Sequence, residues 1–517
     1  MRWLTRMLAI VAIVAVVATG GRQSGAGERD AAELAAQIDR HIETRLKAEQ
    51  LRPADPADDA EFLRRVYLDL HGVIPTATQA DRFLSDTDPN RRGKLIDALL
   101  ASPRYGEYLA DVWQGYLVSP QADDRQVRAD RLREWLAGRF NTKNWDRIAT
   151  ELLTATGKVE ENPAVNYLIE GRLPRTVPDL TDLATRYFLG VRLNCAQCHD
   201  HPFVKWTRQD YWGVAAFFTQ VQTPGKPKQV YKVGVKDDPA ITLASLKDGG
   251  APDGFLPRPP TFLGGEEFRA GDGTTNRAAF AAWMTDPKNP YFAKAMVNRT
   301  WWRLFGRGLV DPVDDMHSAN EPSHPELLDL LASEFIESGF DLKYLTRAVV
   351  SSRAYQRTSR PGEAPEKQAA LFGRMSVKPL SAGQLYDSLV TVLGPPVKTP
   401  GTNPRQNARA EFTQFFADDA APDPVAYRRG IPHLLRQMNS GQFAGRNTAA
   451  LVARLAKSGR SADDVATDMF LAFFSRRPTA DELKRVHAHA ARADSAEAAY
   501  RELAWALMLT SEFSLNR

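Results

Sequence analysis

Residues 62–76, FLRRVYLDLHGVIPT, carry the clearest structural signal of the 517-residue chain. Four apolar side chains in this stretch recur at the i, i+3, i+4 and i+7 spacing of one helix face, namely Leu63, Val66, Tyr67 and Leu70. Gly72 then provides a left-handed cap that ends the helix. Thr76 and Gln79 have the spacing of a capping box at the start of a second helix. The stretch therefore predicts two helices with a tight turn between them.

Comparable helix signals continue on both sides of this stretch. A serine followed by a proline at positions 102–103 places a cap and a first-turn proline before another helix. Ser323 with Glu326, and Thr479 with Glu482, repeat the capping-box spacing. Apolar periodicity predicts further helices at 131–140, 145–154, 179–193, 211–219, 293–304, 324–338 and 503–513.

A segment rich in proline and glycine separates two groups of these helices. Residues 223–276 contain Pro-Gly-Lys-Pro, Asp-Gly-Gly and Pro-Arg-Pro-Pro, which are typical of an extended connector. Alternating Tyr231, Val233 and Val235 predict a short strand of a β-hairpin within it. We predict a mainly α protein with two helical domains, residues 31–222 and 277–517, joined by this connector with minor β-hairpin elements.

Composition and charge narrow the class of protein. Hydrophobic residues make up 43% and charged residues 25%, as in ordinary globular proteins. The net charge of +4 includes Arg2, Arg6 and Arg22 in the first 27 residues, which contain no acid, so removing them leaves 4 − 3 = +1. That charge does not favour a nucleic-acid partner. Motifs of serine hydrolases, zinc proteases and phosphate-binding loops do not occur either, so hydrolase and kinase-like activities lack an anchor in the sequence.

The N-terminus has the composition of a secretory signal. Arg2 and Arg6 precede an apolar run from Met7 to Ala18, and small residues such as Gly20 follow. We therefore predict a signal peptide over residues 1–27 and export to the periplasm or the extracellular space. The apolar run is short for a bilayer span, so no membrane span is expected after cleavage. The alternative is an uncleaved N-terminal anchor.

Residues 195–199, CAQCH, use both cysteines of the chain and follow the second with a histidine. Cys-x-x-Cys-His is the attachment signature of a c-type haem, and chance would produce it in on the order of one chain in 10,000. Cys195 and Cys198 would bond the porphyrin vinyl groups as thioethers, and His199 would ligate the haem iron. If these residues lie on a helix, positions i, i+3 and i+4 share one face.

Other uses of the same groups remain open. The two cysteines could form a disulfide or a redox dithiol, although the surroundings lack the βαβ pattern of thioredoxin-like proteins. Zinc requires four ligands, and the crowded Cys195, Cys198, His199 and His201 would need a distant histidine to complete a tetrahedron. Zinc is therefore the alternative cofactor to haem c. Candidates for that distant histidine are His317 and His324.

A sixth ligand to a haem iron would come from elsewhere in the chain. His201 is a poor candidate, because positions i and i+2 point to different faces of a helix. The remaining candidates are Met296, Met316, His317 and His324. Each of these side chains has a plain alternative in the core or on the surface.

Several long motifs resemble a known pair of domains. Residues 62–76, residues 99–105 (LLASPRY) and residues 195–203 (CAQCHDHPF) resemble the planctomycete cytochrome C-like domain. Residues 289–299 (NPYFAKAMVNR) and residues 306–326, which include GRGLV, DPVDD and PSHPE, resemble the planctomycete-specific domain that commonly follows it. The resemblance spans most of the chain after the signal. It implies a secreted helical protein, both of whose domains are of unknown function, with a cytochrome-like role proposed.

The second half contains one further group of candidate site residues. Asp314 and Asp315 are adjacent, and they could bind a cation or act as acid and base. The alternative is a structural loop in which these carboxylates cap helices and pair with Arg299 or Arg307. Asn298 and Arg299, with Trp301 and Trp302, could line a pocket, or the two tryptophans could belong to an aromatic core.

Three functions follow from these features. The first is an exported electron-transfer protein with one covalent haem c and a redox partner protein. The second is a non-haem extracellular scaffold or binding protein, in which Cys195 and Cys198 form a disulfide or a metal clip. The third is an enzyme that acts on a carbohydrate-like substrate through Asp314 and Asp315. Whether the protein is an enzyme is left open by the sequence.

Overall fold

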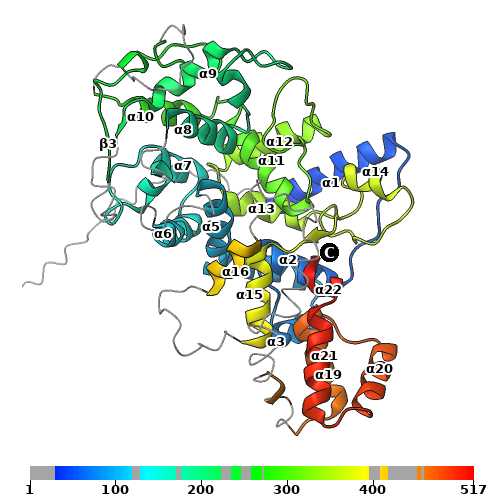
Figure 1. The fold of residues 1–517 in the computed structure, drawn as a ribbon. Coiled ribbons are helices and arrows are strands. Elements are labelled where there is room, and N and C mark those ends of the chain that lie inside the picture. The colour runs from blue at the N-terminus through cyan, green and yellow to red at the C-terminus, as the bar shows by residue number, and fades with distance from the viewer. Residues whose placement is uncertain are drawn as a thin grey trace, which may run out of the picture. The chain divides into compact units, whose positions relative to one another are not determined.

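The computed structural model describes residues 30–118, 128–169, 176–222, 234–245, 258–269, 273–394, 408–416, 451–453, 455 and 459–517. Helices dominate these residues, which confirms the mainly α class (Figure 1). The predicted signal peptide at 1–27 lies outside the described residues. No helix in the described ranges is long and apolar enough to cross a bilayer.

The helices that precede the connector follow one another closely along the chain. They are α1 (Ala31–Ala48), α2 (Asp59–His71), α3 (Ala77–Ser85), α4 (Arg91–Ala101), α5 (Pro103–Leu117), α6 (Ala129–Thr142), α7 (Trp145–Leu153), the 3₁₀-helix η1 (Pro163–Leu168), α8 (Val177–Leu183), the π-helix η2 (Ala184–Phe188), the 3₁₀-helix η3 (Asn194–Gln197), α9 (Arg208–Ala215) and the 3₁₀-helix η4 (Ala216–Phe218).

After a 3₁₀ turn, η6 (Leu243–Ser245), α-helices resume. They are α10 (Asn276–Met284), α11 (Phe292–Phe305), α12 (Pro325–Glu337), α13 (Leu342–Ser351), α14 (Pro365–Ala370), α15 (Ala382–Leu393), α16 (Ala408–Phe416), α19 (Ala462–Phe474), α20 (Ala480–Ala490), α21 (Ala496–Met508) and α22 (Ser511–Ser514).

The strands are short and antiparallel. β1 (Gly157–Lys158), β3 (Gly234–Asp237) and β2 (Val221–Gln222) form one sheet with β3 in the middle. β4 (Lys378–Pro379) pairs with β5 (Leu515–Asn516), so the end of the chain returns to its middle. Val235 of the predicted hairpin strand lies in β3, whereas Tyr231 and Val233 lie outside the described residues.

The local helix signals are confirmed at most of their positions. Gly72 ends α2 with a φ of 68°, and Gly306 ends α11 with a φ of 80°. The capping boxes at Thr76 and Thr479 are both formed. These signals depend on the backbone conformation of a single turn, which neighbouring residues largely decide.

Three local predictions are wrong. The helix predicted over 503–513 is divided, because α21 ends at Met508 and a new helix, α22, begins at Ser511 with Thr510 as its N-cap. Ser323 and Glu326 form no capping box, because α12 begins at Pro325 with His324 as its N-cap, and the Ser323 hydroxyl lies 3.1 Å from His324 Nδ1. The helix predicted over 179–193 ends before Gly190, whose φ is 67°. The Gly190 carbonyl accepts from the Met316 amide at 2.9 Å, so this carbonyl serves a distant loop instead of a further helical turn.

Residues Ala31–Arg517 form one compact unit. Its larger hydrophobic cluster draws on helices from both sides of the connector, and Trp145 of α7 stacks on Phe292 of α11 with ring centroids 6.0 Å apart. A second cluster combines α15, α19 and α21 with Leu68 and Ile74. The boundaries at 222 and 277 stay a prediction about sequence units, because apolar side chains from both units share one core.

Helix α2 is buried on every side. Its apolar stripe packs into the larger cluster as predicted, but Arg64, Arg65 and Asp69 on its other faces are buried as well. Arg64 donates to the carbonyls of Phe473 at 3.0 Å and Phe513 at 2.7 Å. The helix is therefore not amphipathic in the folded protein, because its charged face is covered by the C-terminal elements (Figure 1).

Asp69 is the meeting point of four segments. Its carboxylate accepts from Lys378 Nζ at 2.7 Å, from the Tyr355 hydroxyl at 2.8 Å and from Asn516 Nδ2 at 2.8 Å. Lys378 also donates to the Leu304 carbonyl at 2.6 Å, at the end of α11. The Asp69 carboxylate is thus neutralised by Lys378 of β4 and accepts further hydrogen bonds from β5 and from the segment after α13.

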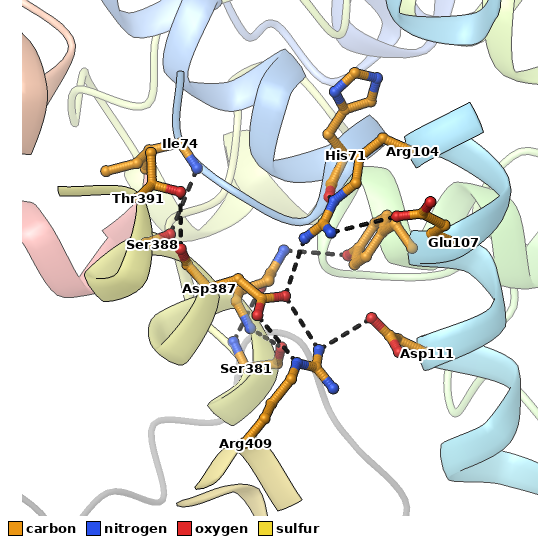
Figure 2. Close-up of polar contacts among 12 residues, drawn as sticks. His71, Ile74, Arg104, Glu107, Asp111, Ser381, Asp387, Ser388, Thr391 and Arg409 are labelled. Carbon is orange, nitrogen blue, oxygen red and sulfur yellow. Dashed lines mark hydrogen bonds and ion pairs between the residues drawn. The ribbon is translucent and has the colours of Figure 1, made fainter. Parts of the chain in front are cut away.

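A second ionic cluster attaches α15 and α16 to α5. Figure 2 shows the Asp387 carboxylate between two guanidinium groups, Arg104 at 3.0 Å and Arg409 at 3.0 Å. Arg409 also donates to Asp111 at 3.0 Å, and the Ile74 amide donates to the Ser388 hydroxyl at 3.4 Å. The positive and negative groups are matched within the cluster, which makes it a structural junction.

Replacing Lys378 with methionine tests the buried pair. The variant leaves the Asp69 carboxylate buried without its cation, which costs about 3–5 kcal/mol of unfolding free energy. The urea midpoint should fall markedly, and adding Asp69→Asn to the same chain should restore part of it. The matched control is Lys94→Met, which removes the exposed Lys94–Asp88 pair and should leave the midpoint nearly unchanged. Equal midpoints for Lys378→Met and the unmodified protein would contradict the role given to Asp69.

Candidate functional site

The Cys-x-x-Cys-His segment lies on a single 3₁₀ turn between Gly190 and α9. Cys195 belongs to η3, and Cys198 follows it directly. This turn replaces the α-helical placement that would bring positions i, i+3 and i+4 to one face. In a 3₁₀ turn, side chains at i and i+3 lie above one another, and Cys195 and Cys198 have this spacing across the end of η3. Both cysteines are exposed and free of a disulfide.

Buried groups hold the backbone of this turn in place. Ala196 is fully buried between the two exposed cysteines. Trp212 of α9 donates its indole Nε1–H to the Gln197 carbonyl at 3.0 Å, and the Arg208 amide donates to Asp200 Oδ1 at 2.8 Å. Helix α9 therefore fixes the backbone of the segment that carries the two exposed thiols.

His199 is exposed, and one of its ring nitrogens is occupied. His199 Nδ1 lies 2.8 Å from the Asp200 carbonyl oxygen. A carbonyl only accepts hydrogen bonds, so Nδ1 carries the proton and the neutral ring has its lone pair on Nε2. Histidines that ligate metals commonly have this arrangement, in which a carbonyl orients the ring through its other nitrogen.

His201 has the opposite arrangement. Its Nδ1 accepts from the Phe203 amide at 3.3 Å, so a neutral His201 carries its proton on Nε2. Its backbone amide donates to the Trp206 carbonyl at 2.8 Å, which closes the loop after the motif. The geometry therefore favours His199 over His201 as a ligand.

An exposed aromatic side chain lies four positions after His199. Phe203 is 82% exposed, more than the other large apolar side chains identified as exposed in the described residues, Trp505 at 39% and Val377 at 37%. Its ring meets the His201 ring edge-on with centroids 6.3 Å apart. The loop that follows the motif thus carries an exposed apolar side chain, although exposing a phenylalanine to water is unfavourable.

The four candidates for a distal ligand lie in different places. Met316 lies against Gly190, with its sulfur 3.2 Å from where a Cβ on that glycine would lie, on the segment that leads to the motif. Met296 is buried beside a cavity of about 10 Å³ that Trp113 and Arg299 also line. The two histidine candidates, His317 and His324, make contacts elsewhere in the structure.

His317 Nε2 lies 3.6 Å from Asp315 Oδ2. His324 is buried against Phe372 with ring centroids 5.5 Å apart. Burial, helped by the nearby Arg45, lowers the pKa of His324 to about 4. Of the four candidates, Met316 is the one whose contacts reach the segment that precedes the motif.

The carboxylates of Asp314 and Asp315 make separate contacts. Asp314 is buried and accepts from Arg299 and from Arg186, the latter at 3.0 Å. The Arg299 guanidinium also lies 5.0 Å from the centre of the Tyr116 ring. The guanidinium groups of Arg299 and Arg186 both bind the Asp314 carboxylate. This arrangement fits the alternative in which Asp314 belongs to a structural loop.

The neighbouring candidates on α11 make structural contacts as well. Asn298 donates to the Val310 carbonyl at 2.8 Å and accepts from the Val310 amide at 2.9 Å. Trp301 is fully buried and stacks on Phe305 with centroids 4.3 Å apart, and Trp302 is also buried. Asn298 thus holds the loop at Val310, and the two tryptophans belong to an aromatic core.

Sequence reasoning missed two residues behind the motif. Asp182 lies on α8 and Tyr211 on α9, and α9 packs against both α8 and the turn η3 that carries Cys195. Burial, reinforced by Asp179, raises the pKa of Asp182 to about 6. Burial also raises the pKa of Tyr211. The sequence around Asp182 could not indicate this raised pKa, because the groups that cover its carboxyl come partly from another helix.

Within the described ranges, no three histidine, cysteine, aspartate or glutamate side chains converge as a metal site would require. Cys195, Cys198 and His199 remain the groups available to a cofactor that bonds through thioethers and one axial histidine.

Comparison with known proteins agrees with the motifs. Residues 37–223 match the family model PSCyt2, a protein of unknown function (DUF1549), and residues 276–440 match PSD1, a protein of unknown function (DUF1553). No curated protein and no solved structure matches the chain. The interval between the two matches coincides with the predicted connector. The chain therefore belongs to the proteins in which a PSCyt2 domain is followed by a PSD1 domain.

Proposed function

We propose that this protein is an exported electron-transfer protein that carries one haem c on Cys195 and Cys198, with His199 as an axial ligand of the iron. When bound, the haem would supply one-electron transfer at a potential set by its axial ligands and by burial. The observation that carries the proposal is the combination of two free, exposed thiols on one turn with a histidine whose Nε2 is left available.

The thiols meet the requirements of covalent attachment. Each S–H adds across one vinyl double bond, so the thiol needs neither a leaving group nor an oxidant. Cys195 and Cys198 have the i, i+3 spacing that a 3₁₀ turn brings to one side, and Trp212 of α9 holds the Gln197 carbonyl between them. The rest of the segment therefore does not have to rearrange to present both sulfurs to one flat cofactor.

The histidine and the nearby phenylalanine support the same proposal. The Asp200 carbonyl orients His199 through Nδ1, as second-shell carbonyls orient metal-ligating histidines. Phe203 is largely exposed beside the motif, and covering it with a porphyrin would remove apolar surface from water. Burying a phenylalanine side chain contributes on the order of 1.5–3 kcal/mol.

Export is part of the proposal, because haem c is attached outside the cytoplasm. The N-terminal basic residues and apolar run favour a cleaved signal and a periplasmic or extracellular location. A redox partner protein would deliver or accept the electron. The alternative is a non-haem scaffold or binding protein in which Cys195 and Cys198 form a disulfide or bind zinc.

Absorption spectroscopy of the exported protein tests the proposal. Expressed with haem c maturation factors, the chain should be coloured and should keep its haem through denaturation and acid–acetone extraction, since thioethers survive both. Serine at Cys195 and Cys198 together should abolish the retained haem. A colourless protein with stoichiometric zinc by elemental analysis, or with thiols that appear only after reduction, would instead support the scaffold alternative.

Paired histidine variants test the axial ligand. His199→Ala should change the Soret band to that of a haem with one ligand lost and shift the midpoint potential. His201→Ala is the matched control, because this ring lies two positions away and its Nδ1 is already an acceptor. It should leave both properties nearly unchanged. Equal effects of the two variants would contradict the assignment of His199.

A further inference from the structure

A small cavity lies between α5, α11 and α13, and its lining does not include the Cys-x-x-Cys-His segment. Its volume is about 10 Å³, which is room for one water-sized particle. Two cations line it, Arg299 and Arg303, one helical turn apart on α11. Positions i and i+4 are neighbours on a helix surface, so like charges there repel each other. No carboxylate is among the described side chains that line the cavity.

The first of these cations shares its carboxylate with another arginine. The guanidinium groups of Arg299 and Arg186 both bind Asp314, so these three side chains carry one positive charge in excess. Arg299 is only 4% exposed. Its guanidinium centre lies 5.9 Å from the centre of the Trp113 ring, and ring faces attract a cation without neutralising it. The excess charge therefore lies in surroundings that screen it weakly.

The second cation has no carboxylate of its own. Arg303 is partly buried and donates to the backbone carbonyl of Asp69. The side-chain carboxylate of Asp69 is already paired with Lys378 at 2.7 Å. Among the ion pairs that the described residues form, none joins Arg303 to a carboxylate. A guanidinium does not lose its proton in proteins, so Arg303 keeps its charge beside the cavity.

Hydrogen-bond donors also remain available at the cavity. Arg299 Nε is buried and has no hydrogen-bond partner among the described residues. The Tyr105 hydroxyl lies 3.1 Å from Thr346 Oγ1, and both side chains line the cavity. One of these hydroxyls donates to the other, so the second keeps its proton for another acceptor. A water molecule would accept from such donors but would add two protons of its own, whereas an anion only accepts.

We propose that this cavity binds one small monovalent anion, which the Arg299 Nε–H, the Arg303 guanidinium and the Tyr105–Thr346 hydroxyl pair hold together. Chloride is the ion whose size comes near that of a water molecule. Its charge balances part of the excess at Arg299 and Arg303, and hydrogen bonds to charged donors are the strong ones. The anion turns a repulsion along α11 into two attractions and connects this helix to α5 and α13. None of these residues belongs to the haem site proposed above.

Thermal unfolding of the full chain tests the proposal, with sodium chloride replaced stepwise by sodium gluconate at constant ionic strength. Gluconate is too large for the cavity, so the exchange changes the possible occupant and leaves the screening of surface charges the same. The melting midpoint should rise with the chloride concentration. Well above the dissociation constant, each tenfold increase in chloride should multiply the ratio of folded to unfolded protein by about ten, because only the folded state binds the ion.

Variants of two arginines locate the effect. Arg303→Met should remove the chloride dependence, because it takes away the cation that no carboxylate balances. This variant should also melt at a lower temperature, so the readout is the slope of the midpoint against the logarithm of the chloride concentration. Arg303→Lys keeps the charge without the planar fork and should need more chloride for the same shift.

Arg307→Met is the matched control. Arg307 is exposed, pairs with Asp311 at 3.4 Å and does not line the cavity, so this variant should keep the full slope. If Arg303→Met shows no cooperative unfolding, the comparison of Arg303→Lys with Arg307→Lys decides in the same way.

Two results would overturn the proposal. Equal midpoints of the unmodified protein in chloride and in gluconate would mean that the cavity holds water only. Equal slopes in the variants of Arg303 and of Arg307 would mean that chloride acts elsewhere on the chain. A slope that is present in the unmodified protein and in the Arg307 variants, and reduced or lost in the Arg303 variants, supports the anion site.

Discussion

The buried carboxylate of Asp69 is the group on which the rest of the structure depends. Its three donors come from β4, from the segment after α13 and from β5, and Lys378 also binds the last turn of α11. Removing a charge from water costs several kcal/mol unless such partners are complete. Helix α2 is therefore stable at the centre of the protein only when these distant segments assemble around it.

Further ionic contacts connect helix α11 to the segment that leads to the Cys-x-x-Cys-His motif. Helix α11, held at its end by Lys378, presents Arg299 to Asp314, and Asp314 also binds Arg186 of η2. The residues after η2 reach Gly190, which binds the loop of Met316, and then lead into the cysteine turn. Asp314 and Arg299 thus connect the PSD1 half to the segment that leads to the motif.

The accuracy of the sequence predictions follows the range of the interactions involved. Caps at Gly72, Thr76 and Thr479 were predictable, because one turn of backbone decides them. The failed capping box at Ser323 and the early helix end at Gly190 involve a histidine contact and a bond to the Met316 loop, respectively. The helical period of α2 was correct, but its polar face was expected in water and is buried.

The sequence by itself determined the helical class, the position of both domain matches and the location of Cys195, Cys198 and His199. These depend on periodicity and on residue spacing, which are local properties of the chain. Tertiary structure alone decided which nitrogen of His199 is available and which charges are buried. Those properties depend on the dielectric surroundings and on partners from distant segments, which no local pattern specifies.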